Sequence, residues 1–126
     1  MALTSLEPRI IHAHDFIIAT PKGQLDFERA KKLLVDIMSA SAPFIDYEIL
    51  LDTRRAQSEL SAIDLWQLVI EIFNFRKPLA RKTAVLCPLE QFDQAEFFAL
   101  CAKNRGFNVS AFTSFEDAIE WLIPSG

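Results

Sequence analysis

Residues 47–68 read YEILLDTRRAQSELSAIDLWQL and decide the fold class of this chain. The apolar run within 48–53 does not alternate with polar residues, which predicts a central strand that is covered on both faces and closed by Asp52. A polar loop, 53–60, comes next, and a helix, 61–74, follows it. Loops that leave the carboxyl ends of strands are where ligands and partners usually dock in α/β proteins. This segment is therefore the candidate functional surface.

The start of this helix carries a capping signal. Ser61 is placed to cap the first turn, and Asp64 stands three residues further on, as in a capping box. Trp66 and Phe73 are seven residues apart and therefore lie near one face of the helix. We prefer the interpretation that both are core residues. Apolar residues recur at helical spacing and predict the buried face: Leu65, Leu68, Val69, Ile72 and Phe73.

Upstream, two short apolar runs follow a loose lead-in at 1–8. The runs cover 10–13 and 16–19 and are separated by His14 and Asp15, which predicts a tight hairpin. One long bent strand is the alternative.

The rest of the chain alternates between helical and strand patterns. We expect a turn at 21–23, a helix over 26–41 capped by Asp26, a buried strand at 83–87, a helix over 92–105 ended by Gly106, a strand at 108–112 and a short helix capped by Ser114. The order is β-β-α-β-α-β-α-β-α. Strands that alternate with helices imply right-handed crossovers and a mixed, mostly parallel sheet with helices packed against it. A chain of 126 residues without linker or repeat predicts one α/β domain, 1–126.

Composition narrows the classes of partner. The net charge of −4 argues against nucleic acid, which requires a concentrated basic face. No apolar run approaches the ~18 residues of a membrane span, and the start of the chain does not resemble a signal peptide. We therefore expect a cytoplasmic protein without membrane insertion. Cys87 and Cys101 fall on apolar stripes and are interpreted as structural thiols.

The residues do not form a recognisable catalytic constellation. His12 and His14 share a strand face, but Asp15 is the only acid near them, so a metal site is not predicted. Three glycines cannot supply a phosphate-binding loop, and no GxSxG elbow is present, so we expect no cofactor and no enzyme. Asp52 is interpreted as a structural acid that accepts hydrogen bonds from the loop or pairs with Arg54 or Arg55.

The element order and its punctuation resemble the STAS fold (sulfate transporter and anti-sigma factor antagonist). The likeness is strongest to small bacterial proteins that are grouped with the CRAL-TRIO lipid carriers. Three stretches carry the resemblance: the opening hairpin with Gly23, EILLDTRRAQSELSAIDLWQL, and KTAVLCPLEQFDQAEFFALCAKNRGFNVSAFTSFEDAIEWL. Together they cover almost the whole chain.

The resemblance implies a serine that a partner kinase phosphorylates at the start of the helix after the central strand. The matching residue is Ser61, with Ser58 just before it. The chain departs from the Asp-Ser-(Ser/Thr)-Gly motif of that family, because Leu60 precedes the serine and Ala62 follows it. This departure favours Ser61 as a helix cap, which is worth ~1 kcal/mol.

The function predicted from these observations is a regulatory or adaptor module. It would bind a protein partner through the loop 53–60 and the helix 61–74, with serine phosphorylation as a switch. The expected site residues are Asp52, Arg54, Arg55, Ser58, Ser61 and Trp66. The alternative is a carrier of a small apolar ligand or lipid, because phenylalanines crowd the last third of the chain. A helix face or a free sheet edge could also support a homodimer.

Overall fold

A five-stranded sheet forms the centre of the protein. The computed structural model describes residues 9–11, 16–41, 48–75 and 82–123. The strands lie in the order β1 (Arg9–Ile11), β2 (Phe16–Ala19), β4 (Glu48–Asp52), β6 (Lys82–Leu86) and β7 (Asn108–Phe112). β1 pairs antiparallel with β2, and the other pairs are parallel. The pairing of the opening hairpin is confirmed, whereas its connection at 12–15 lies outside the described residues.

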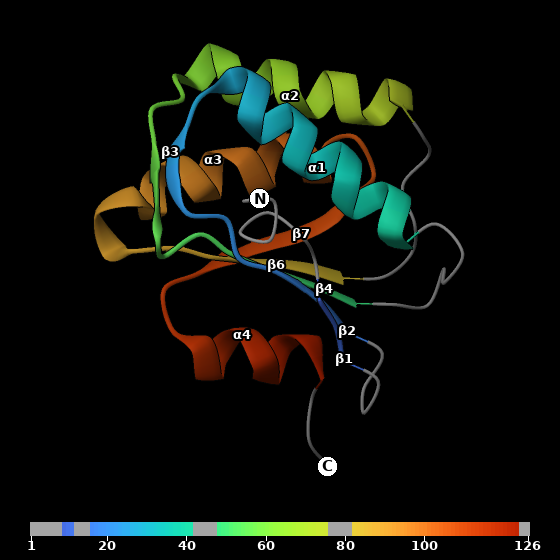
Figure 1. The fold of residues 1–126 in the computed structure, drawn as a ribbon, viewed down its shortest axis with the longest axis vertical. Helices are drawn as coiled ribbons and strands as arrows, with labels where there is room; N and C mark the ends of the chain where they lie inside the picture. The colour runs from blue at the N-terminus through green and yellow to red at the C-terminus, as the bar shows by residue number, and fades with distance from the viewer. Residues whose placement is uncertain (1–8, 12–15, 42–47, 76–81, 124–126) are drawn as a thin grey trace.

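The helices cover both faces of this sheet. α1 (Phe27–Ser41), α2 (Ala62–Phe75) and α3 (Phe92–Lys103) lie on one face, and α4 (Phe115–Leu122) lies on the other (Figure 1). Parallel strands that are added in sequence order, each through a right-handed crossover, place their connecting helices on the same side. α4 follows the last strand and is free to cover the opposite face. The predicted α/β architecture is thereby confirmed.

Alternation along the strands divides the core into two layers. Leu51 and Val85 point toward α1, α2 and α3, where Leu33 and Val69 complete the larger cluster. Side chains one residue away point to the opposite face and pack against α4: Leu50, Ala84 and Leu86. Because both faces are filled, β4 and β6 read as continuous apolar runs, as expected for central parallel strands.

A second, two-stranded sheet corrects the predicted turn and loop. β3 (Gly23–Leu25) and β5 (Ala56–Ser58) pair in parallel; β3 begins at the last residue of the predicted turn 21–23, and β5 lies within the predicted loop 53–60. Leu25 and Ala56 are buried, and their burial stabilises these strands, which are too short to show an alternating sequence pattern. Gly23 adopts a φ of 79°, a left-handed conformation that side-chain-bearing residues rarely take.

The predicted helix starts are confirmed by their hydrogen bonds. The Arg29 amide donates to Asp26 Oδ1 at 2.9 Å, and the Asp117 amide donates to Ser114 Oγ at 3.2 Å. Gly106 has a φ of 92° behind α3, which ends two residues earlier than the sequence pattern indicated. A 3₁₀ turn, η2 (Leu89–Gln91), leads into α3. Within the described ranges, none of the helices combines the length and apolarity that crossing a bilayer requires.

Candidate functional site

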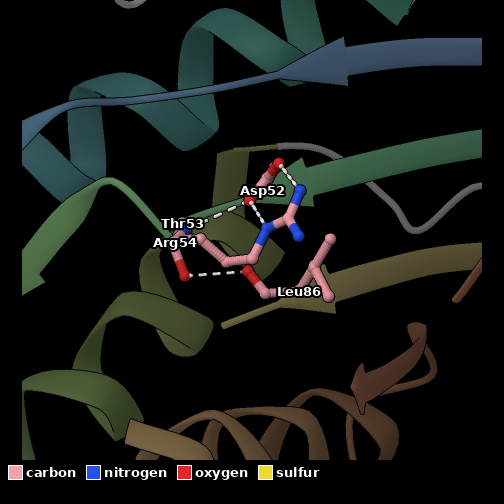
Figure 2. A network of polar contacts seen from close by, with 4 residues as sticks. All are labelled: Asp52, Thr53, Arg54 and Leu86. Atoms are coloured by element: carbon pink, nitrogen blue, oxygen red, sulfur yellow. Dashed lines mark hydrogen bonds and ion pairs between the residues drawn. The ribbon is translucent and has the colours of Figure 1, made fainter. Parts of the chain in front are cut away.

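The carboxyl end of β4 is fixed by a polar network (Figure 2). The Thr53 amide donates to the Leu86 carbonyl at 2.8 Å, and Thr53 Oγ1 donates to the same oxygen at 3.1 Å. Asp52 Oδ1 accepts the Arg54 amide at 3.1 Å. The chain therefore stays attached to the neighbouring strand β6 for one residue beyond β4 before it turns away.

Arg54 folds back onto Asp52. Its Nε donates to Oδ1 at 3.0 Å and its Nη2 donates to Oδ2 at 2.9 Å, which makes a two-point ion pair. The hydrogen bonds that the Arg54 guanidinium donates to Asp52 raise the pKa of Arg54. The guanidinium also lies 6.0 Å from the ring centroid of Phe115. Asp52 thus has the structural role that the sequence predicted, with Arg54 as its partner.

Arg55 is the freely presented cation of the loop. It is exposed, and within the described part of the chain its side chain forms neither an ion pair nor a hydrogen bond. Its backbone carbonyl accepts the Gly23 amide at 3.2 Å. The structure therefore distinguishes the two arginines: Arg54 pairs with Asp52, whereas Arg55 does not, a difference that the sequence did not predict.

The loop is held along its length. Beyond the β3–β5 pairing, the Ala56 amide donates to the Thr53 carbonyl at 3.0 Å, and the Glu59 amide donates to the Leu25 carbonyl at 3.1 Å. Gln94 Nε2 on α3 donates to the Leu60 carbonyl at 3.2 Å. The segment 53–60 is consequently a supported surface, and ordering it on binding would cost little conformational entropy.

The two candidate serines occupy different environments. Ser61 is exposed and forms the expected capping box: its Oγ accepts the Asp64 amide at 3.1 Å, and its own amide donates to Asp64 Oδ2 at 3.0 Å. Ser58 is half-buried, and its Oγ accepts the Leu60 amide at 3.4 Å. Of the two hydroxyls, that of Ser61 is the more accessible.

The interpretation of Trp66 as a core residue is wrong, because half of its surface is exposed to solvent. Ile63, which the sequence analysis did not single out, is 72% exposed and lies one turn before Trp66. Ile70, one turn later, is half-buried. The spacing 63, 66, 70 is a second apolar stripe beside the core stripe, and this signal was present in the sequence. The side chain of Phe73 lies outside the described residues.

An apolar cavity of about 90 Å³ lies beneath the loop. Its lining comes from the ends of β4 and β6, from the three helices and from the β3–β5 ribbon, and includes Leu51, Val85, Leu60, Phe98 and Ala56. Gln94 also lines it, with its Oε1 buried and without a hydrogen-bond partner among the described residues. Pockets for drug-sized ligands measure ~300–1,000 Å³. The space fits a few atoms of a ligand.

Cys87 lines the same cavity and is almost fully buried. Burial, with a smaller contribution from Glu90, raises the pKa of its thiol from 9.0 to about 11. Its Sγ lies 3.6 Å from the Phe112 carbonyl oxygen and donates to it. The thiol therefore stays protonated at neutral pH and lacks the thiolate character of a nucleophile.

The part of the chain that the structure describes contains no cluster of three His, Cys, Asp or Glu side chains that could hold a metal ion. His12, His14 and Asp15 lie outside that part of the chain.

Comparison with known proteins supports the fold class. The element order and sheet topology define a STAS-like α/β domain. The chain is similar to a solved structure, an uncharacterized protein of the DUF3478 family with a SpoIIAA-like fold from Shewanella loihica PV-4, with a TM-score of 0.57 and 18% identity over 91% of each chain. Likeness at this identity shows the fold alone, and the predicted STAS-like fold is confirmed. The chain matches no family model and no curated protein.

The Asp52–Arg54 pair can be measured by a double-mutant cycle in urea. We expect Asp52→Ala to destabilise the protein by about 1–2 kcal/mol, because it removes the acceptor of both the backbone amide and the guanidinium. Arg54→Ala should cost less, with a coupling of about 0.5–1 kcal/mol. Arg55→Ala is the matched control and should stay within about 0.5 kcal/mol of wild type. Equal effects of Arg54→Ala and Arg55→Ala would contradict this role.

The buried thiol predicts a pH dependence of stability. The unfolded chain loses the Cys87 proton near pH 9, whereas the folded chain keeps it until about pH 11. The free energy of unfolding should therefore fall across this interval, by at most about 1.4 kcal/mol per pH unit from this group. Denaturant titrations of Cys87→Ala should show a shallower fall than wild type, and Cys101→Ser should keep the wild-type slope. Identical slopes for all three proteins would refute the assignment.

Proposed function

We propose that the protein is a non-catalytic, cytoplasmic regulatory or adaptor module that binds a protein partner. The docking surface consists of the loop 53–60 and the exposed apolar stripe of α2, Ile63, Trp66 and Ile70. The observation that carries the proposal is the exposure of Trp66 and Ile63, one helical turn apart, directly behind a supported polar loop.

The chemistry of this surface suits a protein partner. Tryptophan and arginine are enriched among the residues that contribute most to binding between proteins. Trp66 supplies a half-exposed aromatic ring, and Arg55 supplies a cation without an internal partner in the described part of the chain. Because β3 already holds the loop, these side chains are presented without a folding step.

A serine switch would act at Ser61. Phosphate there would add a charge of about −1.5 to −2. It would lie within the capping box, beside the Asp64 carboxylate, and two residues before Ile63. Like-charge repulsion with Asp64 and the added hydration next to the apolar stripe would both oppose docking. Half-buried Ser58 is the less suitable site.

Capture from a lysate of the source cells tests the docking surface. Ile63→Glu and Trp66→Ala should each reduce the recovery of partner proteins at least about tenfold, because a loss of 1.4 kcal/mol in binding gives that factor. Ser61→Asp should act in the same direction. The matched control is Leu89→Glu, which changes a 77% exposed leucine outside this surface and should leave the recovery unchanged.

Quantitative mass spectrometry of the captured proteins gives the readout. Circular dichroism of each variant verifies that it is folded. The docking surface would be refuted if Leu89→Glu lost the same partners to the same extent. It would also be refuted if Ile63→Glu and Trp66→Ala retained them. Loss with these two variants but not with Ser61→Asp would remove the switch and keep the surface.

The alternative function, a carrier of a small apolar ligand, rests on the cavity beneath the loop. Its lining is apolar, and the unpartnered Gln94 Oε1 could accept one hydrogen bond from a ligand. Native mass spectrometry of protein from its source cells tests this idea. A carrier predicts a mass increment that is lost on denaturation and is absent from Ala95→Trp, which fills the cavity. A native mass equal to the denatured mass would reject the carrier.

A further inference from the structure

β7 is the last described strand on its side of the sheet, and no other described strand pairs with its outer edge. The order of strands places β6 on one edge of β7 and no described strand on the other. The Cys87 amide donates to the Phe112 carbonyl at 2.9 Å, so the backbone groups of Phe112 and of Ser110, two residues earlier, face β6. The amides and carbonyls of Val109 and Ala111 therefore point to the open edge.

Among the described residues, this edge lacks the features by which proteins protect exposed strands. Exposed edges usually carry a lysine, a proline or a bulge, or are covered by another element. β7 reads NVSAF and contains neither a charged residue nor a proline. Its five residues pair with β6 in continuous register, without a bulge. A strand of this kind is expected to be paired in the working state of the protein.

An open groove runs along the edge between α3 and α4. Phe97, Leu100 and Trp121 contribute apolar surface to it, together with Ala111 and Phe112 of the strand. Leu100 is 55% exposed and Phe97 is 37% exposed, although both are large and apolar. The same face of α3 carries Asp93 and Glu96 at its first turns and Lys103 at its end, because these positions are separated by helical spacing.

Within the described residues, Asp93, Glu96 and Lys103 do not enter ion pairs. α3 connects parallel β6 and β7 and so runs opposite to them, which places Lys103 at the start of β7 and the two acids at its end. A two-fold axis through Ser110 would reverse this order in a second copy. Lys103 of each copy would then face the acids of the other, with Leu100 and Phe97 between the charged ends.

We infer that a second copy of this chain binds at this edge, with the two β7 strands antiparallel and the dyad at Ser110. Val109 would lie opposite Ala111 of the second copy, and each would exchange backbone hydrogen bonds with the other. The two sheets would join into one continuous sheet across the dyad. The interface is isologous, as a two-fold dimer requires, because one patch supplies both the acids and the lysine.

An extended peptide of another protein could also add to a free edge. The distribution of charge favours the second copy, because a single patch is complementary to itself after a two-fold rotation. The inference is independent of the proposed docking surface on α2, since Ile63 and Trp66 do not line this groove.

Sedimentation equilibrium of the purified full chain, from micromolar to sub-millimolar concentration, tests the dimer. We expect wild type to approach twice the chain mass of 14.3 kDa. Lys103→Glu places like charges together at both ends and should weaken the dimer at least about tenfold. The exchange Glu96→Lys with Lys103→Glu restores the complementarity and should recover most of that loss. Recovery separates a charge pairing across the dyad from a structural effect of position 103.

Two further variants locate the interface. Leu100→Glu should yield a monomer, whereas Ile63→Glu on the docking surface should leave the dimer intact. A wild-type mass near 14.3 kDa at the highest concentration overturns the inference. A dimer that survives Leu100→Glu but dissociates with Ile63→Glu overturns it as well, because the contact would then lie on α2. Failure of this inference leaves the docking surface untouched, since the captured partners are measured separately.

Discussion

The structure depends on the position of β4 between two parallel neighbours. β4 pairs with β2 on one side and with β6 on the other, and helices cover both of its faces. Leu50 and Leu51 therefore point into opposite core layers and are both buried. A strand fixed on four sides leaves its carboxyl end with a defined position and direction. The Thr53–Leu86 contact and the Asp52–Arg54 pair make use of that position to direct the loop away from the sheet.

The sequence predicted the parts of the fold that are encoded by local signals. Apolar periodicity located the main strands and helices, and the caps at Asp26, Ser61 and Ser114 followed from single side chains. It did not locate β3 and β5, because a three-residue strand is too short to show alternation. Their pairing is decided by the burial of Leu25 and Ala56 beneath neighbouring elements, which is a tertiary effect.

At the candidate site, too, local signals in the sequence predicted some features, and tertiary packing decides the others. The sequence predicted the structural role of Asp52, but it could not tell whether Arg54 or Arg55 is its partner. That difference arises from the turn after β4, which brings only one guanidinium back to the carboxylate. The preferred core interpretation of Trp66 failed because α2 carries two adjacent apolar stripes. Periodicity correctly predicted that Leu65 and Leu68 are buried, but only the packing of α2 in the structure shows that Trp66 lies outside the buried stripe.

α3 connects the three features at this end of the molecule. Its inner face closes the apolar cavity, Gln94 holds the carbonyl at the end of the loop, and its outer face lines the open edge of β7. A second copy that covers the outer face would restrict the motion of α3 as a unit, because its inner alanines pack closely on the sheet. The loop contacts α3 through one side-chain hydrogen bond and through the packing around Leu60 and Phe98. Pairing at β7 would therefore stiffen the support of the docking surface without contacting it, which is a physical route by which assembly and partner binding could influence each other.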